Sequence, residues 1–166
     1  MSDTVAGEAW RLPLLDVGGE GRYRWAWNLN PNRYKTIGPN RGQPIPRLIV
    51  GRADAIPLRD ACVTVVLVER TPLSRAAAGE IRRVVAPGGL VILRHVPYPD
   101  RDRHAMAVRE IQGTVRRAQR RIGRTIVQET LIRIHHLPPT NQPPEARETT
   151  CVAEALREIL SQDDES

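Results

Sequence analysis

The segment Leu12-Pro13-Leu14-Leu15-Asp16-Val17-Gly18-Gly19 carries the strongest structural signal in the chain, a short apolar run that ends in two glycines. Such a run predicts a strand that leads into a tight turn, because glycine adopts backbone conformations that other residues avoid. Downstream, three more strands are predicted at Trp25–Leu29, Leu48–Val50 and Val63–Val68. The run Val63–Val68 is continuous rather than alternating, which is typical of a strand covered on both faces of its sheet.

The second half of the chain continues this pattern. Arg75–Val85 has an apolar helical face, and the turn Ala86-Pro87-Gly88-Gly89 follows it, where proline and glycine end a helix. Leu90–Leu93 predicts the fifth strand. From Asp102 to about Arg121, apolar residues recur at three- and four-residue steps, which predicts the longest helix, with arginines over the rest of its surface. Thr125–Ile134 alternates and predicts a single final strand, antiparallel to the others.

This order of elements predicts the fold class. Strands that alternate with helices are typical of an α/β fold with a mostly parallel sheet and crossover helices. In open sheets of this kind, ligands bind beyond the carboxyl ends of the strands. The residues that follow each predicted strand are therefore the first candidates for a functional site.

Three of these segments together resemble the class I S-adenosylmethionine-dependent methyltransferases, in order and in spacing. They are the first strand with its glycine turn, the segment Gly51–Asp60 after the third strand, and Glu80–Ile92 with its Pro-Gly-Gly turn. The resemblance covers roughly Leu12 to Val96 and implies a Rossmann-like methyltransferase sheet, reduced in size, that binds S-adenosylmethionine. Glu20 and Arg22 replace the second and third glycines of the family's motif.

The resemblance also implies a cofactor site at the ends of the first three strands. Its residues are Asp16, Gly18, Gly19, Asn30, Asp54 and Ala55. In the family, the glycine turn lies against the methionine moiety, the position of Asp54 bonds the adenine amino group, and small neighbours such as Ala55 leave room for the ring. Asn30 stands near the position of an acid that holds the ribose, and too few residues precede it for the family's first helix. The alternative for Asp54 is a turn-forming residue without a ligand.

Candidate catalytic groups follow the fourth and fifth predicted strands: Glu69, Arg70 and His95. Methyl transfer is an in-line displacement, so the protein mainly positions the acceptor and excludes water. His95 is a candidate general base, because imidazole titrates near neutral pH, and the alternative is a structural histidine. Glu69 and Arg70 are candidates for clamping an acceptor or for pairing with each other. The pair His135-His136 lacks a third ligand at a useful spacing, so no metal site is expected.

The composition is that of a globular protein, with 40% apolar and 27% charged residues in a chain of 166. The net charge is +6, although the residues from Pro138 onward hold seven acids and two arginines. A basic body favours nucleic acid or an acidic partner, and the alternative is that the acidic tail masks it. Cys62 and Cys151 show neither a disulfide framework nor metal-ligand spacing, which predicts reduced thiols and a cytoplasmic protein. No apolar run is long enough to span a membrane.

The distribution of prolines and charges predicts four parts: a flexible N-terminus (1–11), a methyltransferase-like domain (12–137), a Pro-rich linker (138–150) and a short helix with an acidic tail (151–166). The amphipathic stretch Val152–Leu160 predicts docking on the body or on a second copy, so a homodimer or a partner protein is expected. The leading hypothesis is a methyltransferase acting on a peptide, protein or small molecule. The alternatives are a catalytically inactive methyltransferase-like binding or scaffolding protein, and a basic nucleic-acid-binding module or RNA methyltransferase.

Overall fold

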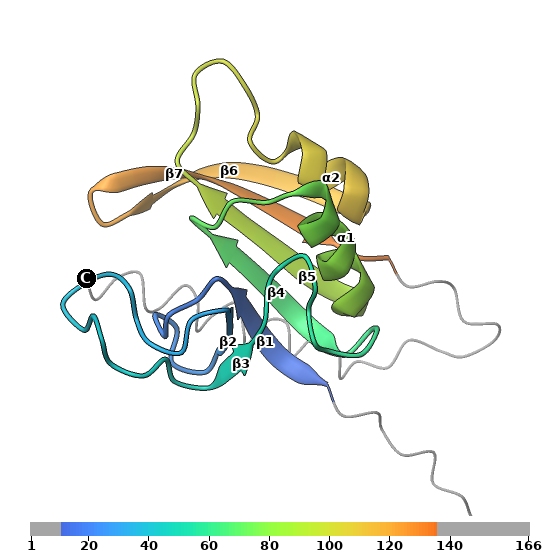
Figure 1. Ribbon diagram of the computed structural model, residues 1–166. Helices are drawn as coiled ribbons and strands as arrows, with labels where there is room; N and C mark the ends of the chain where they lie inside the picture. The colour runs from blue at the N-terminus through green and yellow to red at the C-terminus, as the bar shows by residue number, and fades with distance from the viewer. Residues whose placement is uncertain (1–10, 136–166) are drawn as a thin grey trace, which may run out of the picture.

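The computed structural model describes residues 11–135 as one sheet of seven strands with two helices (Figure 1). The predicted linker, the C-terminal helix with its acidic tail, and all but the last residue of the predicted N-terminal segment lie outside the described residues. The elements are β1 (Leu12–Val17), β2 (Trp27–Asn30), β3 (Leu48–Val50), β4 (Val63–Glu69), α1 (Arg75–Val84), β5 (Val85–His95), α2 (Ala105–Ile111), β6 (Thr114–Ile122) and β7 (Thr125–Arg133).

The strand order is β3-β2-β1-β4-β5-β7-β6. Strands β1 to β5 pair in parallel, with Val17 opposite both Leu29 and Val68, whereas β7 runs antiparallel to β5 and β6 antiparallel to β7. The mostly parallel α/β fold predicted from the sequence is therefore confirmed. Because β1 and β4 are neighbours while the chain leaves β1 toward β2, the order reverses beside β1, which is where ligands bind in sheets of this kind.

Both helices lie on the same face of the sheet (Figure 1). On that face, Leu15, Val66 and Leu93 join one buried cluster with residues of α1 and α2. Successive side chains of a strand point to opposite faces, so the neighbours of these residues form a second cluster on the other face. That second cluster contains residues of β1, β4 and β5 together with Tyr23 and Ala26 from the connection between β1 and β2. No helix of the described residues is long and apolar enough to cross a membrane.

Helix α1 begins at the predicted residue and ends at Val84, one residue earlier than predicted, and the predicted turn Ala86–Gly89 lies within β5. The side chain of Ser74 accepts a hydrogen bond from the backbone N–H of Ala77 and caps the first turn. Arg82 and Arg83 lie in the last turn, where positive charge interacts favourably with the helix dipole. The backbone becomes extended at Val85, two residues before Pro87, so the helix stops ahead of this proline.

The predicted long helix from Asp102 to about Arg121 is wrong. Helix α2 ends at Ile111, Gln112 takes a positive φ of 56°, and the chain continues as β6. A side chain at Gly113 would lie 2.3 Å from the carbonyl oxygen of Arg133, so a glycine lets the two backbones approach here. Nine residue pairs with β7 then outweigh the helical spacing of the apolar residues.

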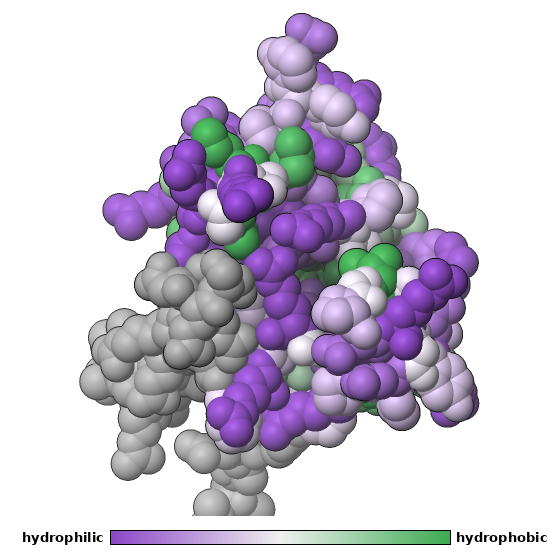
Figure 2. All heavy atoms as spheres, turned by 90° about the vertical axis from the view of Figure 1, so that its left-hand side faces the viewer, coloured by the Kyte–Doolittle hydropathy of each residue, from purple (hydrophilic) through white to green (hydrophobic). Residues whose placement is uncertain are grey.

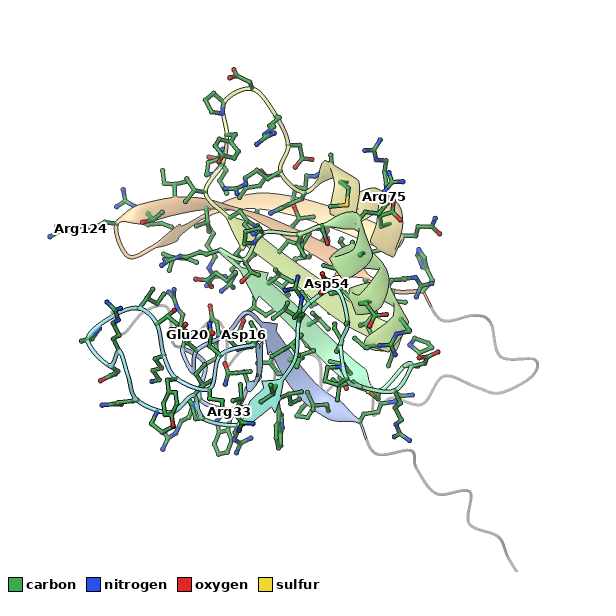
Figure 3. All side chains as sticks on the ribbon, in the orientation of Figure 1. Asp16, Glu20, Arg33, Asp54, Arg75 and Arg124 are labelled. Atoms are coloured by element: carbon green, nitrogen blue, oxygen red, sulfur yellow. The ribbon has the colours of Figure 1, made fainter. Side chains whose placement is uncertain are left out.

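This correction changes the end of the fold in two ways. The sequence predicts one strand after the fifth, whereas the structure has two, β6 and β7. Arg109 lies on α2 as predicted, whereas the later arginines predicted on the helix lie on β6, which is the edge strand of the sheet and mostly exposed. Charged side chains on an edge oppose pairing with another strand. Arg124 lies at the tip of the β6–β7 hairpin, far from the rest of the sheet (Figure 3).

The connections from β1 to β2 (18–26) and from β2 to β3 (31–47) contain no helix, and the first of these absences is predicted from the length of the gap. Glu20 ties the two connections together. Its carboxylate accepts hydrogen bonds from the hydroxyl of Thr36 at 2.6 Å and from the backbone N–H groups of Thr36 and Ile37 at 3.0 and 3.3 Å. The residue that replaces the second glycine of the motif is thus used to fix a loop.

Candidate functional site

Two cavities open side by side at the carboxyl ends of the parallel strands. The first, here called the glycine cavity, has a volume of about 450 Å³ and is lined by Gly18, Leu29 and Pro31, and by residues 51–54 and 71–74. The second, here called the arginine cavity, has a volume of about 400 Å³ and follows β5; its polar lining is His95, Arg101, Asp102, Arg103 and Arg109. Pro72 and Leu73 line both cavities, so the two cavities adjoin along this shared wall. Figure 2 shows a mostly hydrophilic surface on this side of the molecule.

The glycine turn after β1 is closely packed. Gly18 has a φ of +80°, and a side chain there would lie 2.1 Å from the hydroxyl oxygen of Thr71. A side chain at Gly19 would lie 2.4 Å from side-chain oxygens of both Asn28 and Asp16. Packing within the protein alone therefore requires both glycines. The predicted cofactor residue Gly18 also lines the glycine cavity, whereas Gly19 lies beneath the turn against Asp16.

Two asparagines of β2 hold this turn. The side-chain amide of Asn30 donates to the carbonyl oxygens of Gly18 and Gly19 at 3.4 and 3.2 Å, and its oxygen accepts from the backbone N–H of Asn32 at 2.9 Å. Asn28 accepts from the backbone N–H of Gly21 at 3.0 Å. Asn30, predicted to hold a ribose, is buried and engaged in these protein contacts.

Asp54 lines the glycine cavity. Its two carboxylate oxygens accept from Nε and Nη2 of Arg52 at 3.0 and 3.1 Å. These hydrogen bonds lower the pKa of Asp54, which is exposed and therefore ionised at neutral pH. Ala53 lines the cavity beside it, whereas Ala55, also predicted to bind the cofactor, pairs with Arg52 in the turn and is not among the lining residues.

Glu69 belongs to a buried charge cluster on the face opposite the helices, together with Tyr23, Arg94 and Glu129. Arg94 is 1% exposed and donates from Nε to Glu129 at 2.7 Å and from Nη1 to the hydroxyl of Tyr23 at 3.1 Å. The hydroxyl of Tyr23 in turn donates to Glu69, and Arg22 reaches the other oxygen of Glu69 at 2.6 Å. The carboxylate of Glu69 is therefore surrounded by protein donors.

Glu69 and Arg70, predicted to act on an acceptor, line neither cavity. Nε of Arg70 lies 3.6 Å from Glu69, so the two groups pair with each other, which is the second reading that the sequence allows. Arg70 itself has a positive φ of 59° and is largely exposed at the end of β4.

Asp16 lies next to the buried charge cluster and is 4% exposed. Burial raises the pKa of this carboxyl group from 3.8 to about 7, and the charge of Glu69 adds to the effect, while Arg22 and Arg94 oppose it. None of residues 11–135 donates a hydrogen bond to the carboxylate of Asp16. This group therefore retains its proton close to neutral pH.

His95 is buried between the two cavities and is the first member of a chain of hydrogen bonds. Its Nε2 lies 2.7 Å from the carbonyl oxygen of Thr71, its Nδ1 lies 2.9 Å from Nε2 of His104, and Nδ1 of His104 lies 2.7 Å from the hydroxyl of Thr130. A carbonyl only accepts, so Nε2 of His95 carries a proton and its Nδ1 accepts from His104. Nδ1 of His104 then accepts from the hydroxyl of Thr130, and every group in the chain is satisfied with both rings neutral.

Burial lowers the pKa of both histidines, and it lowers the pKa of His104 to about 4, with the proximity of His95 contributing. Neutral rings agree with the hydrogen-bond pattern. Both ring nitrogens of His95 make hydrogen bonds within the protein. The hydrogen bond to Thr71 holds the segment that continues into Pro72 and Leu73, the residues that line both cavities. The sequence gives no sign of His104 and Thr130 as partners of His95, because they come from α2's N-terminal cap and from β7.

No protein-family model matches this sequence. A search of curated proteins likewise finds no match. Solved structures do match. A SAM-dependent methyltransferase from Methanosarcina mazei superposes with a TM-score of 0.53 at 11% identity, over 74% of this chain and 92% of that one. The 1,6-didemethyltoxoflavin-N1-methyltransferase of Burkholderia thailandensis, solved with bound 1,6-didemethyltoxoflavin and S-adenosylhomocysteine, superposes with a TM-score of 0.52 at 12% identity, over 74% and 70%.

The fold is that of a class I methyltransferase. At these identities the similarity shows the fold alone. The methyltransferase fold of this chain has two adjoining cavities at the carboxyl ends of its strands, one with apolar walls and a carboxylate on its rim and one with three arginines. This arrangement offers space for two small molecules in adjoining cavities that share Pro72 and Leu73.

Proposed function

We propose that this protein is a methyltransferase that binds S-adenosylmethionine in the glycine cavity and a methyl acceptor in the arginine cavity. The observation that supports this most is that the two cavities adjoin and share Pro72 and Leu73 in their linings, because transfer requires donor and acceptor to lie within contact distance. The position of the glycine cavity after β1, β2, β3 and β4, at the point where the strand order reverses, is a second support.

The residues of the glycine cavity fit the adenosine part of this cofactor. A volume of about 450 Å³ lies within the range of about 300–1,000 Å³ typical of small-molecule sites. Leu29 and Ala53 offer apolar surface for a flat ring, and Asp54 offers acceptors for an amino group. Asp16, also predicted to bind the cofactor, is buried against Gly19 and is not among the residues that line this cavity.

The fit is weaker for the ribose, in keeping with a shortened domain and a degenerate glycine motif. Asn30 stands where a carboxylate would bind the ribose hydroxyls, and its amide is engaged with the glycine turn. Charge-assisted hydrogen bonds are roughly twice as strong as neutral ones, so we expect a lower affinity for the cofactor than a carboxylate would give.

When bound, S-adenosylmethionine supplies an electrophilic methyl group. The residues of this chain position the acceptor and exclude water from it. We assign His95 a positioning role, because its bond to the carbonyl oxygen of Thr71 holds the wall that both ligands would share. Glu69 and Arg70 would act indirectly, by holding the end of β4 through the buried charge cluster.

Titration of the full chain with S-adenosylhomocysteine, followed by calorimetry, tests this proposal. We expect binding by the wild type and about a tenfold or greater loss in Asp54→Ala, which removes charged acceptors worth about 1.5–3 kcal/mol. Asp100→Ala is the matched control, because Asp100 is exposed and lines neither cavity. The proposal is overturned if the wild type shows no binding at millimolar ligand, and the inactive scaffolding alternative then stands.

A nucleic-acid-binding function is the second candidate, favoured by the arginines on the edge strand β6 and at the hairpin tip. Its affinity for a fluorescent ten-nucleotide RNA should fall steeply with added salt, because phosphate contacts release counterions. Fluorescence anisotropy that shows no binding at low salt would reject this candidate.

A further inference from the structure

The arginine cavity has an unusual charge balance. Three of its lining residues are arginines, Arg101, Arg103 and Arg109, and Asp102 is the one carboxylate among them. An arginine guanidinium offers several N–H donors in a planar fork that matches the oxygens of a carboxylate or a phosphate. The lining therefore presents donors for an anion, unless nearby acids already neutralise it.

Asp102, which lines the cavity, and Glu110, which follows the lining residue Arg109, already have partners in the protein. Asp102 accepts from the backbone N–H of His104 at 2.9 Å and from the side chain of Gln128 at 2.7 Å, and it pairs with Arg117 at 2.9 Å. Glu110, the neighbour of Arg109 in α2, pairs with Arg75 at 3.0 Å. The positive charge of the cavity is therefore not balanced by these carboxylates.

Two of the arginines are held in place by an aromatic ring. The guanidinium carbons of Arg101 and Arg103 lie 5.0 and 4.4 Å from the centre of the ring of Tyr98. Arg103 also donates to the carbonyl oxygen of Val96 at 3.4 Å. Side chains fixed before binding lose less conformational entropy when a ligand arrives, so their hydrogen bonds contribute more to affinity.

The remaining lining indicates a small molecule with an apolar part. Leu73 and Met106 supply apolar surface, and the volume of about 400 Å³ suits a small molecule. We propose that the arginine cavity binds a small acidic molecule, through its carboxylate or phosphate group, and that this molecule is the methyl acceptor. The second part rests on the proposed methyltransferase function, whereas anion binding itself does not.

The experiment measures the affinity of three probes for the full chain at constant ionic strength: benzoate, phenyl phosphate and the neutral benzamide. We expect at least one of the two anions to bind about tenfold or more tightly than benzamide, and the tighter anion identifies the acid group. The single variant Arg103→Gln should weaken the binding of that anion by about tenfold or more. Arg82→Gln is the matched control, with the same change of charge on an exposed position of α1 outside the cavity, and it should change the affinity by less than about twofold.

Three results would overturn the proposal: benzamide binding as tightly as the anions, the Arg82→Gln control losing as much affinity as the cavity variant, or neither anion binding at about 20 mM. Titration of the same samples with S-adenosylhomocysteine separates the two proposals. If the anions bind but S-adenosylhomocysteine does not, the anion site stands and the methyltransferase function fails. If only S-adenosylhomocysteine binds, the anion site fails while the cofactor site stands.

Discussion

The substitution Asp16→Asn should change how the stability of this protein depends on pH. In the folded protein the pKa of Asp16 is raised from 3.8 to about 7, mainly by burial. Between these two values the folded state keeps a proton that the unfolded state has lost, so folding becomes less favourable as pH rises. The stabilisation is fully present below pH 3.8 and is lost as pH rises through about 7.

The magnitude follows from the size of the shift. A difference of about three pKa units corresponds to about 4 kcal/mol, at about 1.4 kcal/mol for each unit. Asparagine has nearly the same shape and does not ionise, so it removes this dependence. The free energy of unfolding of Asp16→Asn, measured relative to the wild type, should therefore rise by up to about 4 kcal/mol between pH 4 and pH 8.

Urea unfolding at a series of pH values measures this difference directly. Taking the difference between variant and wild type cancels the contribution of every other titrating group, including the histidines, whose effect has the opposite sign. Asp100→Asn, an exposed acid, is the control and should give a flat difference curve. A difference curve for Asp16→Asn that is also flat within about 0.5 kcal/mol would refute the raised pKa and with it the burial of this carboxyl group.

Three further predictions concern packing and charge. Gly18→Ala should destabilise the protein more than Gly38→Ala does, by about 1–3 kcal/mol in urea unfolding: both glycines have a positive φ, but only Gly18 has a neighbour within 4 Å of the added carbon. Equal losses would contradict the packed turn. Arg94→Met should cost about 3–5 kcal/mol, because it leaves buried carboxylates unpaired, and adding Glu129→Met should recover part of that loss; no recovery would argue against their pairing. Because the folded state holds His104 neutral, the free energy of unfolding of the wild type should fall by up to about 3 kcal/mol as pH falls from 6.5 to about 4, relative to His104→Gln. A difference between the two proteins that stays constant or grows in the opposite direction would contradict this.

Much of the sheet was predictable from the sequence, because its strands are short apolar runs bounded by turn residues. Val63–Glu69 and the end of α1 are examples in which local pattern and tertiary structure agree. The error at α2 and β6 has a physical cause: apolar residues spaced for a helix also fit a strand once β7 is available as a partner. Pairing with a distant strand outweighs the local spacing of apolar residues there, and that local spacing carries no information about the pairing.

The candidate site likewise has a part that could be predicted from the sequence and a part that could not. Gly18 and Asp54 both line the glycine cavity, and each lies in a turn after a strand that the sequence predicts, whereas binding of a cofactor there stays a prediction. The partners of Glu69 were not predictable, because Tyr23, Arg94 and Glu129 come from three separate parts of the chain. Arg94, which directly follows the apolar run Leu90–Leu93, is the one feature of the sequence that indicates a buried charge cluster.

The proposed cofactor site can be tested by mapping where S-adenosylhomocysteine binds. Two-dimensional ¹H–¹⁵N NMR spectra of the full chain, recorded during titration with S-adenosylhomocysteine, report which backbone amides the ligand affects. We predict that the largest shifts occur at Gly18, Leu29, Gly51 and Ala53, which line the glycine cavity, and that Gly123 in the β6–β7 turn is unchanged. Shifts centred outside the glycine cavity, or no shifts at millimolar ligand, would contradict the account.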